Sequence, residues 1–291
     1  MKRPAPPPRD PPAAGVLFGP PQPSGDEALT PAALQRRLRT AVFGHRVFYY
    51  PSIGSTNDRA LELAAAGEPE GSLVLAEEQT LGRGRRDRSW SSPPCSGIYA
   101  TLILRPSVPA PRAPLFTFMA AVAVTEALEE AAAVPARIKW PNDVMVGTRK
   151  IAGILGEVRG SDPEIRELVV GFGINVNHGP EDFPADLRGR ATSVRVETGV
   201  PAERASILAR LLEGLERRYG RLLRGEASDL LREWEGLSAL PPGERVVVQG
   251  PGGRVEGSVV GVDDEGALLL RDGDGRAVRV PFGEIVRCFW P

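Results

Sequence analysis

The chain has few cysteines, no long apolar run and no excess of charge, and each absence excludes a class of protein. Cys95 and Cys288 are its only cysteines, too few for a disulfide framework in 291 residues, so a reducing cytoplasm fits best. No apolar run approaches the roughly 20 residues that a membrane-spanning helix needs. The 36 basic and 37 acidic side chains give a net charge of −1, which argues against a general nucleic-acid binder.

The beginning of the chain is dominated by proline. Ten of the 29 prolines lie between Pro4 and Pro31. Because proline lacks the amide donor that helices and central strands need, we predict a disordered, partly polyproline tail over residues 1–29. Prolines also follow the charged residues 1–9 where a secretory signal would have an apolar stretch.

Residues 30–240 mix helical and strand patterns without a regular alternation, which predicts an α+β domain. Thr30 and Pro31 begin a helix that extends through Leu38, and Thr56 caps a second helix that Gly67 ends. Further helices are expected over residues 114–133, 206–223 and 229–237. Strands are expected over residues 46–50, 72–77, 98–104, 151–158 and 168–174, with a short one around Ile138.

Residues 241–291 change character and predict a small all-β barrel. Five short apolar runs are separated by turn sequences such as "GG", "DEG" and "DGDG". From Pro241 onward the chain has six arginines and eight acidic residues, a net of −2. A nucleic-acid-binding barrel should be basic, so we expect a packing or protein-contact module.

The most unusual local feature is the segment "GRGRRDRSW" at residues 82–90, directly after a predicted strand. Four arginines and one aspartate give the segment a net charge of +3, so its arginines repel one another on a backbone with flexible glycines. A bound anion would offset the cost of ordering them. A solvated basic loop is the alternative. A dinucleotide fingerprint fails, because Asp87 stands where the third glycine belongs.

Two weaker motifs follow. Residues 139–143 read "KWPND" and lead to "KIAGIL" at residues 150–155, and residues 171–177 read "GFGINVN", in which glycine permits close backbone approach and asparagine can contact a base edge. His45 and His178 lie outside these motifs as we define them, and we expect surface or packing roles for both.

Taken together and in this order, the motifs resemble those of the biotin protein ligase family. The resemblance begins with "STN" at residues 55–57 and includes Gln79 and the three motifs above. It continues through "ATS" at residues 191–193 into the C-terminal segment. Its implied fold is α+β: a mixed-sheet catalytic domain of the biotin/lipoate ligase type over residues 30–240, then a small SH3-like β-barrel over residues 241–291. The family usually has glycine at the positions of Asp87 and Cys95.

The resemblance implies a role for each matched residue. Lys150 and Arg85 would act in catalysis. The implied biotin contacts are Ser55, Thr56, Asn57, Gln79, Arg83, Gly84, Arg85, Lys150 and Gly153. The implied nucleotide contacts are Arg83, Arg85, Asn142, Lys150 and Asn175. The metal ligands are not indicated.

The implied activity is ATP-dependent attachment of biotin to a lysine, through biotinyl-5'-AMP. ATP and biotin would be substrates, with Mg²⁺. The partner would be the biotin carboxyl carrier protein or domain of acetyl-CoA carboxylase or another biotin-dependent carboxylase, and the enzyme a cytoplasmic monomer or homodimer without nucleic-acid or membrane partners. Three alternatives stay open: a lipoate or octanoate ligase or transferase of the same fold, a biotin-responsive DNA-binding repressor, and a module that binds adenylate without catalysis.

Overall fold

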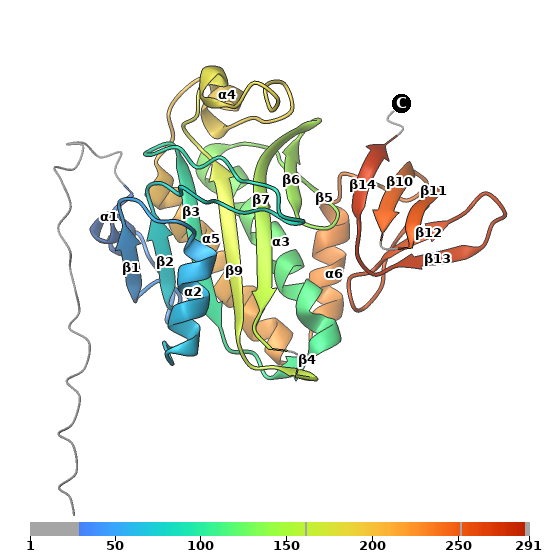
Figure 1. Ribbon diagram of the computed structural model, residues 1–291, viewed down its shortest axis with the longest axis horizontal. Helices are drawn as coiled ribbons and strands as arrows, with labels where there is room; N and C mark the ends of the chain where they lie inside the picture. Colours follow the sequence, from blue (N-terminus) through green and yellow to red (C-terminus); the bar gives the residue numbers. More distant parts are fainter. Residues whose placement is uncertain (1–28, 161, 251, 289–291) are drawn as a thin grey trace, which may run out of the picture.

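The computed structural model describes residues 29–160, 162–250 and 252–288. A seven-stranded sheet forms the centre of the larger domain, in the order β1-β2-β3-β9-β7-β6-β5 (Figure 1). Strands β1 and β2 pair in parallel and all other neighbours are antiparallel. The strands span β1 Val47–Tyr50, β2 Leu73–Ala76, β3 Gly97–Leu104, β5 Arg137–Lys139, β6 Asp143–Val146, β7 Arg149–Val158 and β9 Leu168–Asn175.

Helices cover both faces of this sheet, which is why its central strands are apolar on both sides. Alternate side chains of a strand point to opposite faces. Leu73 and Leu75 therefore join the main core, whereas Val74 packs with Ala60 and Leu63 of the helix α2. In Figure 1, α2 lies in front of the sheet, and α3 and α5 lie behind it. The helices span α1 Pro31–Gln35, α2 Thr56–Ala65, α3 Ala113–Ala132, α4 Val194–Thr198, α5 Arg204–Leu223 and α6 Ala227–Gly236.

The second domain follows α6 and is all-β, as expected. Its five strands form an antiparallel sheet in the order β13-β12-β11-β10-β14. The Trp140 indole of the larger domain donates a hydrogen bond to the Gly266 carbonyl (3.1 Å), so the two domains are in direct contact. The strands span β10 Arg245–Gly250, β11 Gly253–Val262, β12 Leu268–Arg271, β13 Ala277–Val280 and β14 Glu284–Cys288.

Several local expectations need correction. Ser55, not Thr56, is the N-cap of α2, and its hydroxyl accepts from the Asp58 amide (3.4 Å). Helix α1 ends at Gln35 rather than near Leu38. Strand β6, the helix α4 and the short pair β4 Val108–Pro109 with β8 Glu164–Ile165 were not expected.

Leu29 was assigned to the proline-rich tail, but it belongs to the folded domain. Its side chain is buried and its amide donates to the Glu77 carboxylate (3.0 Å). The rest of that tail, residues 1–28, lies outside the described residues. Within the described residues, no helix combines the length and apolarity needed to cross a membrane.

Candidate functional site

A pocket of about 310 Å³ opens on the α2 face of the sheet. Every residue to which the sequence analysis gave a binding or catalytic role lines it. These residues are Ser55, Thr56, Asn57, Gln79, Arg83, Gly84, Arg85, Asn142, Lys150, Gly153 and Asn175. They come from α2, two loops and the strands β7 and β9, so only the fold brings them together.

Glycines form the floor of the pocket. Gly153 of β7 pairs with Gly173 of β9. A Cβ at Gly173 would lie 2.4 Å from the Trp90 indole, and one at Gly171 would lie 2.0 Å from the side-chain oxygen Oδ1 of Asn57. The glycines of residues 171–177 therefore make room for Trp90 and Asn57, as the close approach inferred from the sequence requires.

The N-terminus of α2 contributes a buried, hydrogen-bonded polar cluster. The Gln79 side-chain carbonyl accepts from both the amide and the hydroxyl of Thr56, each at 2.9 Å. Thr101 donates to Asn57 Oδ1 (2.7 Å), and Asn57 Nδ2 donates to Glu157 (2.6 Å). These side chains are fixed by one another, so the cluster is organised before any ligand binds.

Lys150 lies at the centre of the site between a carboxylate and an aromatic ring. Its Nζ is 2.5 Å from Asp143 Oδ1 and 5.1 Å from the centre of the Trp90 ring. The carboxylate and the ring contact the ammonium from two sides and hold it in place. Lys150 is thus a fixed positive charge that faces the pocket.

The arginine loop, residues 82–88, adds further positive charge along the rim. Arg83 forms ion pairs with Asp58 and with Glu157 (3.2 Å to the latter). Arg85 is more buried than Arg83. Burial is the main cause that lowers the pKa of Arg85, and the neighbouring charge of Arg86 lowers it further. Its acceptors are two neutral oxygens, Asn142 Oδ1 (3.3 Å) and the Gly283 carbonyl (3.2 Å).

The amide groups of Asn142 and Asn175 are held by the backbone. Asn142 Nδ2 donates to the Ile154 carbonyl (2.8 Å), and Asn175 Nδ2 donates to the Thr192 carbonyl (2.9 Å). Each asparagine therefore fixes a loop segment as well as lining the pocket. The sequence had indicated a nucleotide contact only.

The structure gives a physical reason for glycine at the two positions that depart from the family pattern. Asp87 has φ 58° and Cys95 has φ 60°, a region that favours glycine. Burial, followed by Glu77, raises the pKa of the Cys95 thiol. A catalytic cysteine needs a lowered pKa, so Cys95 does not resemble the nucleophile of an acyltransferase.

Sequence reasoning missed several residues of the pocket, above all His178. Its ring is 1% exposed, stacks on Phe183 with centroids 5.3 Å apart, and lies 3.3 Å from the Tyr99 hydroxyl. Burial lowers the pKa of His178 to about 4, so the ring is neutral at pH 7. In the sequence, only its position directly after the "GINVN" segment connects His178 with the site. That position does not predict its contacts with Tyr99 and Phe183.

Two carboxylates, Asp143 and Glu284, line the pocket, and each is paired with a basic side chain. Within the described residues, no group of three or more histidine, cysteine, aspartate or glutamate side chains could hold a metal ion. Asp143 is the carboxylate that contacts Lys150. A magnesium ion carried by a nucleotide needs one or two such carboxylates besides its phosphates and waters, so the pocket fits that mode of binding.

Two family models match the chain. Residues 49–175 match the biotin/lipoate A/B protein ligase family, and residues 243–287 match the biotin protein ligase C-terminal domain. The first range covers most of the pocket, and the second covers most of the all-β domain. The pocket residues outside the first range are Glu284 and five residues between His178 and Ala191.

Curated relatives and solved structures agree with these models. The chain is 38% identical over 247 residues to the bifunctional ligase/repressor BirA of Bacillus subtilis, covering 85% of this chain and 76% of that protein. It is 37% identical over 235 residues to a biotin–[acetyl-CoA-carboxylase] ligase of Paracoccus denitrificans, covering 79% and 96% respectively. The biotin protein ligase of Aquifex aeolicus, solved with biotin and ATP, superposes with a TM-score of 0.71 at 28% identity, covering 82% of this chain and 97% of that one.

Proposed function

Because the chain belongs to the biotin protein ligase family, we propose that it attaches biotin to a lysine of a biotin carboxyl carrier protein at the expense of ATP. The observation that carries the proposal is the convergence of eleven family-matched residues on one pocket, with Lys150 at its centre. The match of residues 243–287 to a domain described for biotin protein ligases favours biotin over lipoate.

The first step joins two anions, and the site supplies positive charge for it. A biotin carboxylate oxygen attacks the α-phosphorus of ATP, a new P–O bond forms, and the bond to the β-phosphate bridge breaks to release pyrophosphate. Charge accumulates on the α-phosphate oxygens in the transition state, and fixed cations there lower the barrier. Lys150, held by Asp143, and Arg85, whose hydrogen-bond acceptors among the described residues are neutral, fit this role.

The second step transfers the biotinyl group to an amine. The acceptor lysine attacks the carbonyl carbon of biotinyl-5'-AMP, a C–N bond forms, the C–O bond to the phosphate breaks, and the amine loses a proton to solvent. The adenylate is a mixed anhydride that water destroys. The arginine loop and Trp90 line the same pocket and would limit its contact with water until the acceptor arrives.

The remaining polar residues fit substrate binding. Ser55, Thr56, Asn57 and Gln79 make up the organised cluster at the α2 end, which suits a ligand with several hydrogen-bonding groups. Gly84 and Gly153 leave room for the ligand, and Asn142 and Asn175 lie on the proposed nucleotide side with Arg83. Mg²⁺ would enter with the triphosphate and neutralise its charge, and Asp143, which lines the pocket and also pairs with Lys150, would be a candidate ligand. Two free cysteines are consistent with a reducing cytoplasm.

The decisive assay follows adenylate formation with each candidate acid. The full chain is incubated with MgATP and hydroxylamine, and pyrophosphate and the acyl hydroxamate are measured with biotin, lipoate or octanoate. We expect product with biotin at least about a hundredfold faster than with the other acids, the discrimination that lost hydrogen bonds in a polar pocket can give. Preferential reaction with lipoate or octanoate would replace the proposal with the rival activity of this fold.

A further inference from the structure

The arginine loop contacts two domains, and its contacts divide between them. Arg83 pairs with Asp58 and Glu157 of the larger domain. The other three arginines reach the C-terminal domain. Arg85 and Arg86 donate to backbone carbonyls there, at Gly283 (3.2 Å) and Gln249 (2.8 Å) respectively. The loop is therefore a bridge across the rim of the pocket.

One carboxylate of the C-terminal domain serves two loop arginines. Glu284, the first residue of β14, has Oε1 2.9 Å from Arg88 Nη1 and Oε2 3.5 Å from Arg86 Nη1. Its side chain is about a third exposed and lines the same pocket as Lys150. The repulsion expected among the arginines from sequence is thus partly offset by a carboxylate of the protein itself.

In the part of the chain that the structure describes, the side chain of Glu284 forms its ion pairs with the arginine loop rather than with its own domain. These pairs go to Arg86 and Arg88. The neighbouring backbone is closely packed: a Cβ at Gly283 would lie 2.9 Å from Val248 and 3.0 Å from the Gln249 carbonyl. The backbone next to Glu284 is therefore held by packing at Gly283, and this packing does not involve the Glu284 carboxylate.

The loop needs such support because its backbone is unfavourable. Arg86 and Asp87 are consecutive non-glycine residues with φ of 56° and 58°. Left-handed conformations of this kind cost energy and persist where the surroundings hold them. Arg85, immediately before them, is half-buried, and its hydrogen-bond acceptors among the described residues are neutral, so its charge is available to an anion in the pocket.

We propose that Glu284 is a positioning residue of this ligase: by pairing with Arg86 and Arg88, it holds the arginine loop so that Arg85 faces the anionic reactants. The inference rests on the proposed function, and it makes the C-terminal domain part of the adenylate-forming site. Glu284 acts through the loop and needs no contact with either substrate.

The test compares Glu284→Gln with Glu256→Gln in the full chain. Glu256 is a matched control, since it is an exposed glutamate of the same domain that pairs with an arginine, Arg245, away from the pocket. Without the Glu284 carboxylate, a smaller fraction of molecules holds the loop with Arg85 facing the pocket. The apparent affinity for ATP falls in proportion to that fraction. We expect the KM for ATP in the biotin-dependent pyrophosphate assay to rise about tenfold, with kcat within about twofold of wild type. Glu256→Gln should match wild type in both.

Limited trypsin digestion supplies a readout that does not depend on activity. Cleavage after the arginines of residues 83–88 should be faster in free Glu284→Gln than in free wild type or Glu256→Gln. Arg88→Gln removes the same contact from the loop side and should reproduce the rise in KM, and Glu284→Asp should restore part of the affinity. An unchanged KM with unchanged cleavage would overturn the inference, and so would a lower kcat at an unchanged KM. If wild type forms no pyrophosphate with biotin, the proposed function fails, while the cleavage comparison still tests the loop contact.

Discussion

Lys150 owes its position to Asp143 and Trp90, neither of which was given a firm role from sequence. The ammonium pairs with Asp143 at 2.5 Å and lies over the Trp90 ring. Lys150→Ala should remove the central positive charge and slow biotin-dependent pyrophosphate release at least about a hundredfold. Arg149→Ala is the control, because Arg149 pairs with Glu197 and does not line the pocket. Near-normal turnover by Lys150→Ala would remove this residue from the mechanism.

His178 makes the stability of the fold depend on pH. Its folded-state pKa is about 4, below the value of about 6.5 in an unfolded chain. Between these values the unfolded chain binds a proton that the folded chain does not, so the free energy of unfolding falls as pH falls. The loss should be about 2 kcal/mol between pH 7 and pH 5. Urea denaturation of His178→Gln should show a pH dependence smaller by that amount, and an unchanged dependence would show that the ring is not buried and neutral.

A single glycine in β9 determines whether Trp90 can lie on the floor of the pocket. A Cβ at Gly173 would clash with the indole at 2.4 Å. Gly173→Ala should displace Trp90 and weaken biotin binding, measured by calorimetry, about tenfold or more. Gly236→Ala is the matched control, because its Cβ would meet no atom within 4 Å at the end of α6. Equal affinities for the two variants would contradict this account of the floor.

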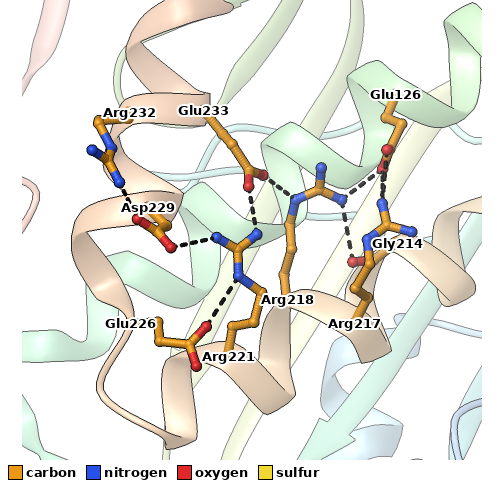
Figure 2. A network of polar contacts seen from close by, with 9 residues as sticks. All are labelled: Glu126, Gly214, Arg217, Arg218, Arg221, Glu226, Asp229, Arg232 and Glu233. Carbon is orange, nitrogen blue, oxygen red and sulfur yellow. Dashed lines mark hydrogen bonds and ion pairs between the residues drawn. The ribbon is translucent and has the colours of Figure 1, made fainter.

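At the scale of elements, the helices α3, α5 and α6 are joined by a network of ion pairs, shown in Figure 2. Arg218 of α5 is nearly buried and contacts Glu126 of α3 (2.6 Å) and Glu233 of α6 (2.7 Å). Arg221 adds three further carboxylate contacts. The network therefore fixes how the three helices pack behind the sheet.

Arg218→Ala should lower the free energy of unfolding by about 2 kcal/mol, because it removes two charge-assisted hydrogen bonds and leaves two carboxylates without their shared partner. Arg232→Ala offers the comparison within the same network. The Arg232 side chain is 76% exposed and pairs with Asp229, so its loss should cost less than about 0.5 kcal/mol. Denaturant titrations that give equal losses would show that burial does not decide the strength of these pairs.

The elements that sequence predicted well are those specified locally. Helix α3 and the strands β3 and β9 have long apolar patterns, and their observed bounds lie within two residues of those expected. Strand β6 was missed because it begins at Asp143, directly after the polar "PN", and its strand character comes from pairing with β5 and β7. The cap of α2 was misplaced by one residue because Ser55 and Thr56 are both good caps, and only the geometry distinguishes them.

The sequence motifs named residues that line one pocket. They did not predict the contacts between residues of different elements. All eleven named residues share one pocket, but which carboxylate holds Lys150 and which holds the arginine loop depends on three-dimensional packing. His178 is the clearest case. Its neighbour Tyr99 lies 79 residues earlier, in β3, and its neighbour Phe183 lies five residues later, directly after a short 3-10 helix over Pro180–Asp182.

At the scale of the whole molecule, the site lies where two domains meet. The larger domain supplies the pocket floor, the polar cluster and Lys150, and the C-terminal domain supplies Gly283 and Glu284 to the arginine loop. The acidic balance and small size of the C-terminal domain agree with a role in this contact. We propose that this assembly of two domains transfers biotin to one lysine of a carrier protein.

That claim is tested most directly by mass spectrometry of the carrier. A purified biotin carboxyl carrier domain is incubated with the full chain, MgATP and biotin, in parallel with Lys150→Ala and with a carrier in which the acceptor lysine is arginine. The account predicts that the wild-type carrier gains the mass of one biotinyl group at that lysine, that Lys150→Ala gives at most about a hundredth of the rate, and that the arginine carrier stays unmodified. A carrier that remains unmodified with active wild-type adenylate formation, or one that accepts lipoate instead, would contradict it.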